Sequence, residues 1–369
     1  MAGEARDPGL DGLRGAAVLL VVLFHLQVLE FGWLGVSLFF VISGHLITRT
    51  LMARRELRPL VRLRDFARNR ALRLAPLYLL CCGLVTAAAL ISGDPRIQDD
   101  LLALWTWTFN LRPLDPGFTP NTFDVYDPMW SIGAESQIYL LWAVAALLPR
   151  RQFQRLVLGL ICLGPLARVA LAGASSGAGV RSEFLLLAVF SSPVTYLDAF
   201  AWGACTAFPE LRARWARYAP LVLAMSGIVL AGTVVHAAWL TGRLPPDLAL
   251  PVLLADRGGW VWQYSVVAAL FAAAAFHAVR GGRFQRVLAN RLLVRAGVLS
   301  YSVYLLHTPI VWLFVDVWSG GSEAPWSAVG IIAAVGALVV IAVVAELAHR
   351  FVEVPFFRWK RRPLTDAAG

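Results

Sequence analysis

Five ionisable side chains lie within or at the ends of long apolar segments of this 369-residue sequence: His25, His45, Glu135, Asp198 and His307. On membrane-insertion scales such a group costs roughly 2.5 to 3.5 kcal/mol at the centre of a helix that crosses a bilayer. We therefore expect each of them to face a protein interior and to serve a function. Because imidazole and carboxylate groups exchange protons, the chemistry that they favour is general acid–base catalysis.

Arg14 and His25 are eleven residues apart. Eleven residues make about three turns of an α-helix, so both side chains are expected on one face, about 16 Å apart along the axis. With Arg14 at the cytoplasmic end, His25 is expected near the middle of the bilayer, where burial keeps the imidazole neutral and able to act as a general base. The alternative is a structural histidine bonded to a neighbouring helix, and this helix taken alone favours that alternative.

A basic segment ends with Arg70 and Arg73, shortly before Pro76. Residues three apart on a helix face one way, so the two guanidinium groups could each donate paired hydrogen bonds to a pyrophosphate. The alternative is that these arginines, like the others of the segment, only anchor the chain to anionic lipid. We assign phosphate binding to this last pair alone.

A further polar face is expected near the end of the chain. Ser300, Tyr304 and His307 recur at spacings of four and three, with Tyr301 beside them. Residues at these spacings share one side of a helix, here running from the cytoplasmic rim toward the bilayer centre. We expect the hydroxyl groups to line an inner groove and His307 to meet His25 near the midplane.

Trp130, Ser131 and Glu135 open another apolar segment, directly after an aromatic and proline-rich stretch at residues 93–128. A carboxylate at this place could orient a hydroxyl group or pair with a histidine. The stretch before it is expected to be partly re-entrant and to cap a cavity from outside, because irregular backbone is tolerated where it faces water or protein.

The elements that must position these groups are membrane-spanning helices. Charged residues make up only 15% of the chain and hydrophobic residues 59%, whereas a soluble domain carries about 25% charged residues. Apolar runs of about 20 residues recur, each long enough to cross a 30 Å hydrocarbon core. The expected spans lie near residues 13–29, 34–52, 74–91, 130–148, 156–171, 194–208, 221–240, 260–279, 298–317 and 328–348. We expect an all-α membrane protein, a bundle of about ten transmembrane helices in one domain over residues 1–369, with no soluble domain after the last span.

The basic residues predict the orientation of this bundle. Of the 33 Lys and Arg residues, 27 fall in alternate connecting segments on the side of the N-terminus. The other six, taken as outward, are Arg96, Arg112, Arg168, Arg181, Arg243 and Arg257. Because cytoplasmic segments are enriched in Lys and Arg, both termini are expected to be cytoplasmic, in the inner membrane of a bacterial cell.

Two other classes of partner are excluded by the same residues. The net charge of +10 comes from short patches between apolar runs rather than from one basic domain, so no nucleic acid is expected as a partner. The histidines and the four cysteines do not occur at the spacings of a metal site, so no metal is expected either.

At these positions the sequence resembles the acyltransferase-3 family of membrane O-acyltransferases, which use acyl-CoA. The matching segments stand in family order and cover nearly the whole chain, which makes the resemblance highly specific. They are LDGLRG at 10–15, GVSLFFVISGHLI at 35–47, the arginines before Pro76, WSIGAE at 130–135, LDAFAWGA at 197–204, SYSVYLLH at 300–307 and VEVP at 352–355.

Each candidate residue is assigned an expected role, and the resemblance implies several of these roles. His25 would be the catalytic base, and Glu135 would act beside it on the acyl-transfer path. The residues expected to hold acyl-CoA, predicted to be acetyl-CoA, are Arg14, Arg70, Arg73, Ser300, Tyr301 and Tyr304. Those expected at the acceptor are His45, Trp130, Ser131, Asp198 and His307. The family's usual aromatic after Ser-Gly is replaced by His45, and a basic residue common before Leu-Asp is replaced by Tyr196.

The predicted reaction moves an acyl group, acetyl or short-chain, from acyl-CoA to a hydroxyl group of a carbohydrate or of a secreted natural product such as a macrolide. The alternative class is a proton-coupled membrane transporter, in which the buried histidines and carboxylates form a proton relay. Transporters of that kind contain paired half-length spans broken by Gly or Pro, and their absence here argues against it.

Overall fold

A computed structural model describes residues 7–118, 124–254, 258–318 and 327–360, and these residues form helices and connecting turns without any strand. They divide into two compact units, each of which draws on separate parts of the chain. Unit 1 contains residues 1–50, 113–116 and 149–300, and unit 2 contains residues 51–112, 117–148 and 301–369. The all-helical fold expected from the sequence is confirmed for the described residues.

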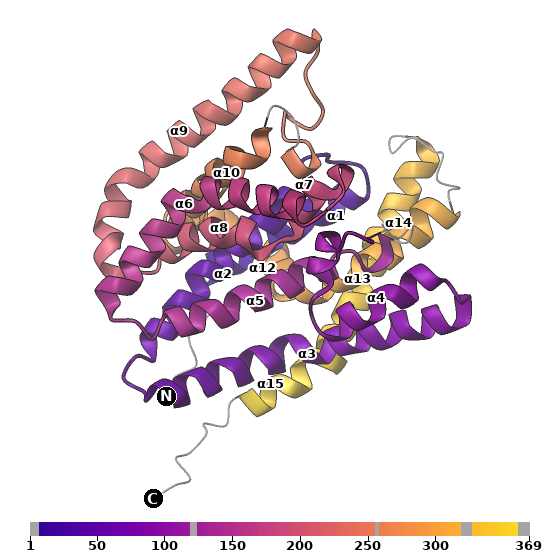
Figure 1. The fold of residues 1–369 in the computed structure, drawn as a ribbon, viewed down its shortest axis with the longest axis horizontal. Coiled ribbons are helices and arrows are strands. Elements are labelled where there is room, and N and C mark those ends of the chain that lie inside the picture. Colours follow the sequence, from indigo (N-terminus) through magenta and orange to yellow (C-terminus); the bar gives the residue numbers. More distant parts are fainter. Residues whose placement is uncertain (1–6, 119–123, 255–257, 319–326, 361–369) are drawn as a thin grey trace, which may run out of the picture. The chain divides into compact units, whose positions relative to one another are not determined.

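Unit 1 is built around α6, α8 and α10, which pack side by side (Figure 1). Its helices are α1 (Pro8–His25), α2 (Leu34–Ala53, whose last three residues belong to unit 2), η3 (Ser182–Phe184), α6 (Arg150–Gly177), α7 (Leu185–Ser191), α8 (Pro193–Cys205), α9 (Pro209–Thr241), η4 (Val252–Leu254), α10 (Gly259–Arg280), α11 (Arg283–Leu288) and α12 (Arg291–Val298).

Unit 2 places its C-terminal helix against the long helix α3, as Figure 1 shows for α15 and α3. Its elements are α3 (Pro59–Ser92), α4 (Pro95–Trp105), η1 (Phe109–Leu114, whose last two residues belong to unit 1), η2 (Asp124–Tyr126), α5 (Met129–Ala145), α13 (Ser300–Trp312, from its second residue), α14 (Ala328–Ala348), α15 (Val354–Lys360) and the π-helical turns η6 (Leu313–Trp318) and η7 (His349–Glu353).

Short sequence signals set the ends of these helices. Asp7 caps α1 by accepting hydrogen bonds from Gly9 N at 3.0 Å and Leu10 N at 3.3 Å. Side-chain oxygens at this position satisfy amide groups that have no partner within the helix. The C-terminal end of α3 is set by Gly93. Its φ of 66° is left-handed, a conformation that glycine adopts without steric cost.

Helix α1 approaches α11 and α12 at glycines of the LDGLRG segment. A Cβ atom added to Gly12 would lie 1.8 Å from Leu288 O of α11, and one added to Gly15 would lie 2.0 Å from Leu293 O of α12. In return, a Cβ on Gly297 of α12 would lie 1.7 Å from Asp11 O. These positions admit only glycine, because any larger residue would push the helices apart.

The membrane spans agree with the sequence prediction in part. Eight described helices are long and apolar enough to cross a bilayer, and the pair α12 and α13, bent by 78°, adds a ninth if it counts as one span. Helix α5 coincides with an expected span but has only 17 residues. The protein is therefore a multi-pass membrane protein. The count of ten spans stays a prediction. The cytoplasmic placement of the two termini also stays a prediction, and both termini lie outside the described residues.

Two expectations about these segments are wrong. Helix α1 ends at His25 instead of continuing to residue 29, so His25 is its last residue and not an interior one. Arg168, counted as an outward loop residue, lies within α6 with its side chain fully buried. The stretch 93–128 contains helix α4, and its partly re-entrant course stays a prediction.

The described part of the 93–128 stretch in unit 2 is held by a polar cluster around Asp100. The carboxylate of Asp100 accepts from Arg112 Nε at 2.8 Å and from the Tyr126 hydroxyl at 2.9 Å. Burial, reinforced by the Asp100 charge, raises the pKa of Tyr126 well above its ordinary value, which keeps the phenol protonated as a donor. The segment is thus a folded part of unit 2.

Candidate active site

His25 is oriented by its own helix. Its Nδ1 lies 2.9 Å from the carbonyl oxygen of Val21, one turn earlier in α1. A carbonyl oxygen can only accept, so Nδ1 carries the proton, and in the neutral imidazole Nε2 carries the lone pair. This tautomer, assigned from the hydrogen-bond geometry, is the one that a general base acting through Nε2 requires.

Arg14 lies earlier on α1 and contacts the start of α13. Its Nη2 donates to Ser300 Oγ at 3.1 Å, within unit 1. Ser300 is 2% exposed, and Arg14 is partly buried. The structure therefore brings together two of the residues predicted to bind acyl-CoA.

His45 lies in α2 and is fixed by Thr206, the residue that follows α8. Its Nδ1 is 2.7 Å from Thr206 Oγ1, while that hydroxyl donates its proton to Gly203 O at 2.6 Å. Since the Thr206 proton is already used, Nδ1 of His45 must be the donor. His45 is only 2% exposed, so its predicted contact with an acceptor is not open in this conformation.

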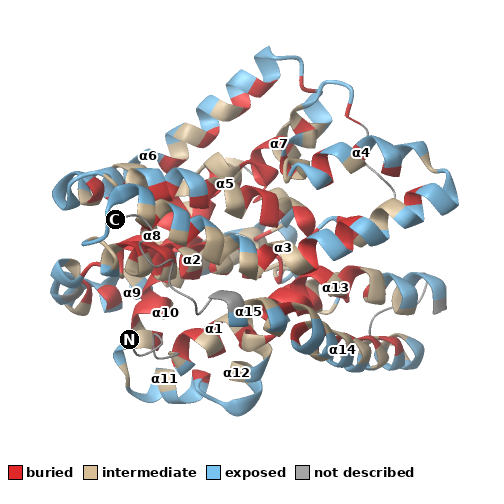
Figure 2. Cartoon of the chain, turned by 90° about the horizontal axis from the view of Figure 1, so that it is seen from below, coloured by how far each residue is buried: buried red, intermediate tan, exposed pale blue. Residues whose placement is uncertain are grey.

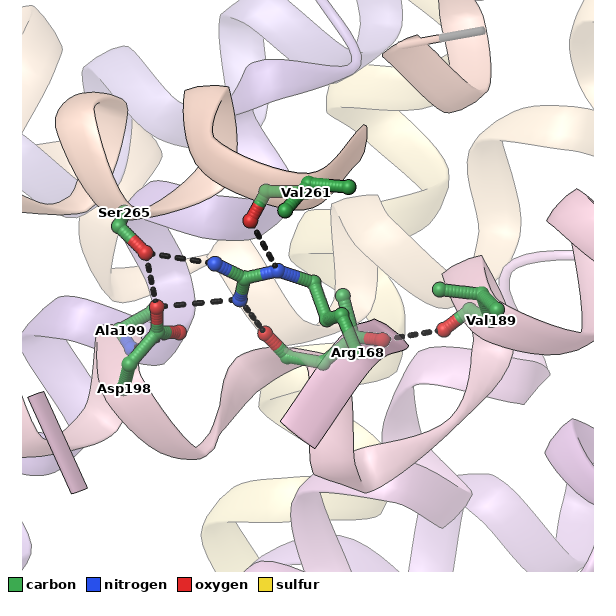
Figure 3. Close-up of polar contacts among 7 residues, drawn as sticks. Arg168, Val189, Asp198, Ala199, Val261 and Ser265 are labelled. Carbon is green, nitrogen blue, oxygen red and sulfur yellow. Dashed lines mark hydrogen bonds and ion pairs between the residues drawn. The ribbon is translucent and has the colours of Figure 1, made fainter. Parts of the chain in front are cut away.

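Asp198 forms a fully buried ion pair with Arg168, which sequence reasoning had not connected to it (Figure 3). Arg168 Nη1 donates to Asp198 Oδ2 at 3.0 Å and to Thr195 O at 2.9 Å, and Nε donates to Val261 O at 3.0 Å. Ser265 bridges the two charged groups. This network joins α6, α8 and α10 and gives Asp198 a structural role beside the predicted acceptor role.

In unit 2, Arg70 lies between two aromatic rings. Its guanidinium carbon is 5.6 Å from the centre of the Phe66 ring and 5.5 Å from that of the Tyr139 ring. The Tyr139 hydroxyl donates to the carboxylate of Glu135. Two predicted site residues on α3 and α5 are therefore linked through Tyr139, which the sequence reading had not singled out although it lies one helical turn after Glu135.

Arg73 lies one turn beyond Arg70 on α3 and differs from it in its contacts. Among the described residues, its partly buried guanidinium has no hydrogen-bond or ion-pair partner. Close by, the Tyr301 hydroxyl donates to Leu74 O at 2.6 Å, tying α13 to α3.

The remaining candidates of unit 2 gather along α13 and the start of α5. Ser131 Oγ lies 2.6 Å from the Tyr304 hydroxyl, and His307 Nδ1 donates to Tyr304 O at 2.7 Å. All three are buried, whereas Trp130 is half-buried. The groove expected along Ser300, Tyr304 and His307 stays a prediction, and in this structure the three side chains are buried.

One buried polar group at the C-terminal end escaped the prediction, although the VEVP segment contains it. Glu353 accepts from the Ser302 hydroxyl and lies 3.2 Å from His349 Nδ1. Glu353 is 1% exposed and His349 9%. Within the described ranges, no group of three or more His, Cys, Asp and Glu side chains could hold a metal ion.

Residues 7–346 match the family model for an acyltransferase domain, acyltransferase 3. The chain belongs to the acyltransferase-3 family. It is therefore a membrane acyltransferase, which confirms the resemblance drawn from the seven segments. His349 and Glu353 lie beyond the matched residues.

This acyltransferase is similar to the O-acetyltransferase OatA of Staphylococcus aureus strain NCTC 8325, with 28% identity over 94% of this chain and 57% of the relative. It is also similar to a protein of S. aureus strain COL that is named as the O-acetyltransferase SACOL0978. The identity is 26% over 95% of this chain and 57% of the relative. The chain thus spans little more than half the length of these relatives. No solved structure matches it.

Proposed function

We propose that this acyltransferase moves an acetyl or short acyl group from acyl-CoA to a hydroxyl group of an acceptor at a bacterial cell membrane. The observation that carries the proposal is the tautomer of His25, whose Nδ1 is committed to Val21 O so that Nε2 is the basic nitrogen. A general base of this kind contributes roughly 10² to 10⁴ in rate.

The donor is assigned to unit 2. Arg73 supports this assignment, because no hydrogen-bond or ion-pair partner of its guanidinium is found among the described residues and a guanidinium suits the phosphates of coenzyme A. Arg70, held against two aromatic rings, would supply the second donor group. With the cytoplasmic orientation that the basic residues predict, acyl-CoA would arrive from the cytosol.

The reaction proposed for these groups needs no further reactant. His25 Nε2 removes the proton of the acceptor hydroxyl, and the resulting oxygen nucleophile attacks the thioester carbonyl carbon. The new C–O bond forms as the C–S bond breaks, and the coenzyme A thiolate leaves with the electron pair of that bond. The proton held by His25 then returns to the thiolate or to water, which restores the neutral imidazole.

The acceptor is proposed to be a carbohydrate or a secreted natural product. The names of the relatives, which are O-acetyltransferases, support an oxygen acceptor and an acetyl group. His45, Trp130, Ser131, Asp198 and His307 remain the candidates for acceptor contacts, and Glu135 the candidate for a second acid–base group.

The test compares the glycans and secreted metabolites of a strain that carries the intact gene with those of its deletion strain. We expect one acyl mass difference that returns when the gene is restored and does not return with the His25→Ala variant. Restoration with His277→Ala is the matched control, since His277, in the last turn of α10, is another histidine of unit 1 and has no assigned role. If His25→Ala restores the modification fully, the proposal is wrong.

A further inference from the structure

Helices α11 and α12 of unit 1 lie at the ends of two apolar helices. Gly9 at the start of α1 approaches Gln285 of α11, and Gly12 approaches Leu288 O at the end of α11. Helix α10 ends at Arg280, two residues before α11 begins. Since α1 and α10 are both candidate membrane spans, α11 and α12 lie where those spans leave the hydrocarbon core.

The outer sides of these two helices carry large apolar side chains that are exposed on the surface of the structure. Leu292 is 81% exposed, Val287 67% and Phe284 43%. In Figure 2 the outer sides of α11 and α12 are pale blue, while the side toward α1 is buried. The side chains that pack inward are few, so the apolar outer face is not explained by packing within unit 1.

The same outer face is strongly basic. Arg283, Arg286 and Arg291 are exposed, and none of them has a hydrogen-bond or ion-pair partner among the described residues. Residues 281–297 contain no Asp or Glu at all. Basic and apolar residues alternate within two short helices at the end of a span, which is the composition of helices that lie in a membrane interface.

We propose that α11 and α12 form an interfacial surface that binds the headgroups of anionic phospholipids. Arg283, Arg286 and Arg291 contact the lipid phosphates, while Phe284, Val287 and Leu292 enter the boundary between headgroups and acyl chains. The surface is separate from the residues assigned to acyl transfer. Charge and apolar character together favour an anionic phospholipid as the occupant. An uncharged lipid would give the arginines no net negative charge to bind, and a soluble anion would make no contact with the apolar side chains.

The experiment places a fluorophore at residue 292 of the full chain, as Leu292→Cys in a background without Cys81, Cys82, Cys162 and Cys205. The protein is reconstituted in nanodiscs of phosphatidylcholine that contain phosphatidylglycerol with a nitroxide near its headgroup. We expect strong quenching by the labelled phosphatidylglycerol and weak quenching by iodide. A fluorophore that iodide quenches as it quenches the free dye would show that the surface faces water and would overturn the proposal.

Substitutions separate the contributions of charge and apolar contact. Arg283→Gln, Arg286→Gln and Arg291→Gln together should lower the enrichment of phosphatidylglycerol around the fluorophore about tenfold, since each basic residue near an anionic surface contributes modestly. The same three positions changed to Lys should retain most of the enrichment. In the matched control, Arg151→Gln, Arg155→Gln and Arg214→Gln remove equal charge from exposed positions of α6 and α9 and should have little effect.

Two outcomes would reject the proposal. If the control triple reduces the enrichment as much as the α11–α12 triple, the attraction is a property of net charge and not of this surface. If inorganic phosphate or coenzyme A displaces phosphatidylglycerol at concentrations that leave the lipid around the control positions unchanged, the surface binds soluble phosphate compounds instead. A size-exclusion profile that matches the wild type shows that each variant is folded.

Discussion

Arg14 of the LDGLRG segment donates to Ser300, the first residue of the SYSVYLLH segment, across 286 positions of sequence within unit 1. The glycines of the first segment allow the close approach of α12 that places Ser300 within reach of Arg14. Two residues that the family resemblance picked out separately are therefore hydrogen-bonded within unit 1.

Ser300→Ala should lower the free energy of unfolding by roughly 1.5 to 3 kcal/mol, because it removes a hydrogen bond that a charged group makes in a largely buried place. The measurement is the thermal unfolding midpoint of the purified protein in detergent. Ser37→Ala is the matched control, since Ser37 is also buried but its hydroxyl has no partner in the described structure. Equal midpoints for the two variants would contradict the role given to Ser300.

His25→Ala should reduce the rate of acyl transfer by about 10² to 10⁴ without a comparable loss of donor binding, because the imidazole acts on the acceptor proton. Rate and binding are measured separately, the first with labelled acetyl-CoA and the second by calorimetry. His277→Ala should leave both near the wild-type values. A His25→Ala enzyme that keeps its rate within about tenfold of wild type falls short of the range for a general base and indicates a structural histidine.

Arg70→Ala combined with Arg73→Ala should raise the concentration of acyl-CoA needed for half-maximal rate far more than that of the acceptor. Lys at both positions should rescue only in part, because an ammonium group cannot bind a phosphate in the bidentate manner of a guanidinium. Arg64→Ala, at an exposed position earlier on α3, serves as the control. Unchanged affinity of the double variant for coenzyme A would leave these arginines as lipid anchors.

Asp198→Ala should destabilise unit 1 by about 3 to 5 kcal/mol, because it leaves the Arg168 guanidinium buried without its counter-charge. Replacing both partners, by Arg168→Met with Asp198→Leu, should recover much of that stability. Thermal unfolding and acceptor kinetics are measured on the same preparations. If Asp198→Ala unfolds like the wild type but needs more acceptor for half-maximal rate, Asp198 binds substrate and the ion pair is incidental.

Single cysteines in a background without the four native ones test the orientation on which the donor assignment depends. Cysteines replacing Arg64, Arg151, Arg214 or Arg286 should be protected from an impermeant thiol reagent in intact cells, because basic segments stay in the cytoplasm. Cysteines replacing Asp99, Ser176 or Leu244 should react. All seven positions are exposed in the structure, so protection reports the membrane and not burial. Reaction at positions 64 and 151 would place the donor arginines on the outer side.

The sequence alone was sufficient for the class of the protein. A low charged fraction, repeated apolar runs and seven ordered segments predict a multi-pass helical acyltransferase, and these features are local, so no long-range geometry is needed to read them. The start of α1 at Pro8 was not predicted, since the expected span began near residue 13, although Asp7 and Pro8 form a capping pair that can be recognised from residue type. The end of α1 at His25 was missed, because apolar residues continue past it and hide the turn.

Which side chains form ion pairs and hydrogen bonds with one another was determined only by the tertiary structure. No spacing rule connects Arg168 with Asp198 or Ser302 with Glu353, because each pair joins helices that are separate in sequence and meet only when the chain packs. Periodicity places Ser300, Tyr304 and His307 on a shared helix face but does not tell whether that face lines a groove or meets other helices. In the folded chain the face is filled by Arg14, Ser131 and backbone carbonyls, since buried polar groups are stable only when their hydrogen bonds are satisfied.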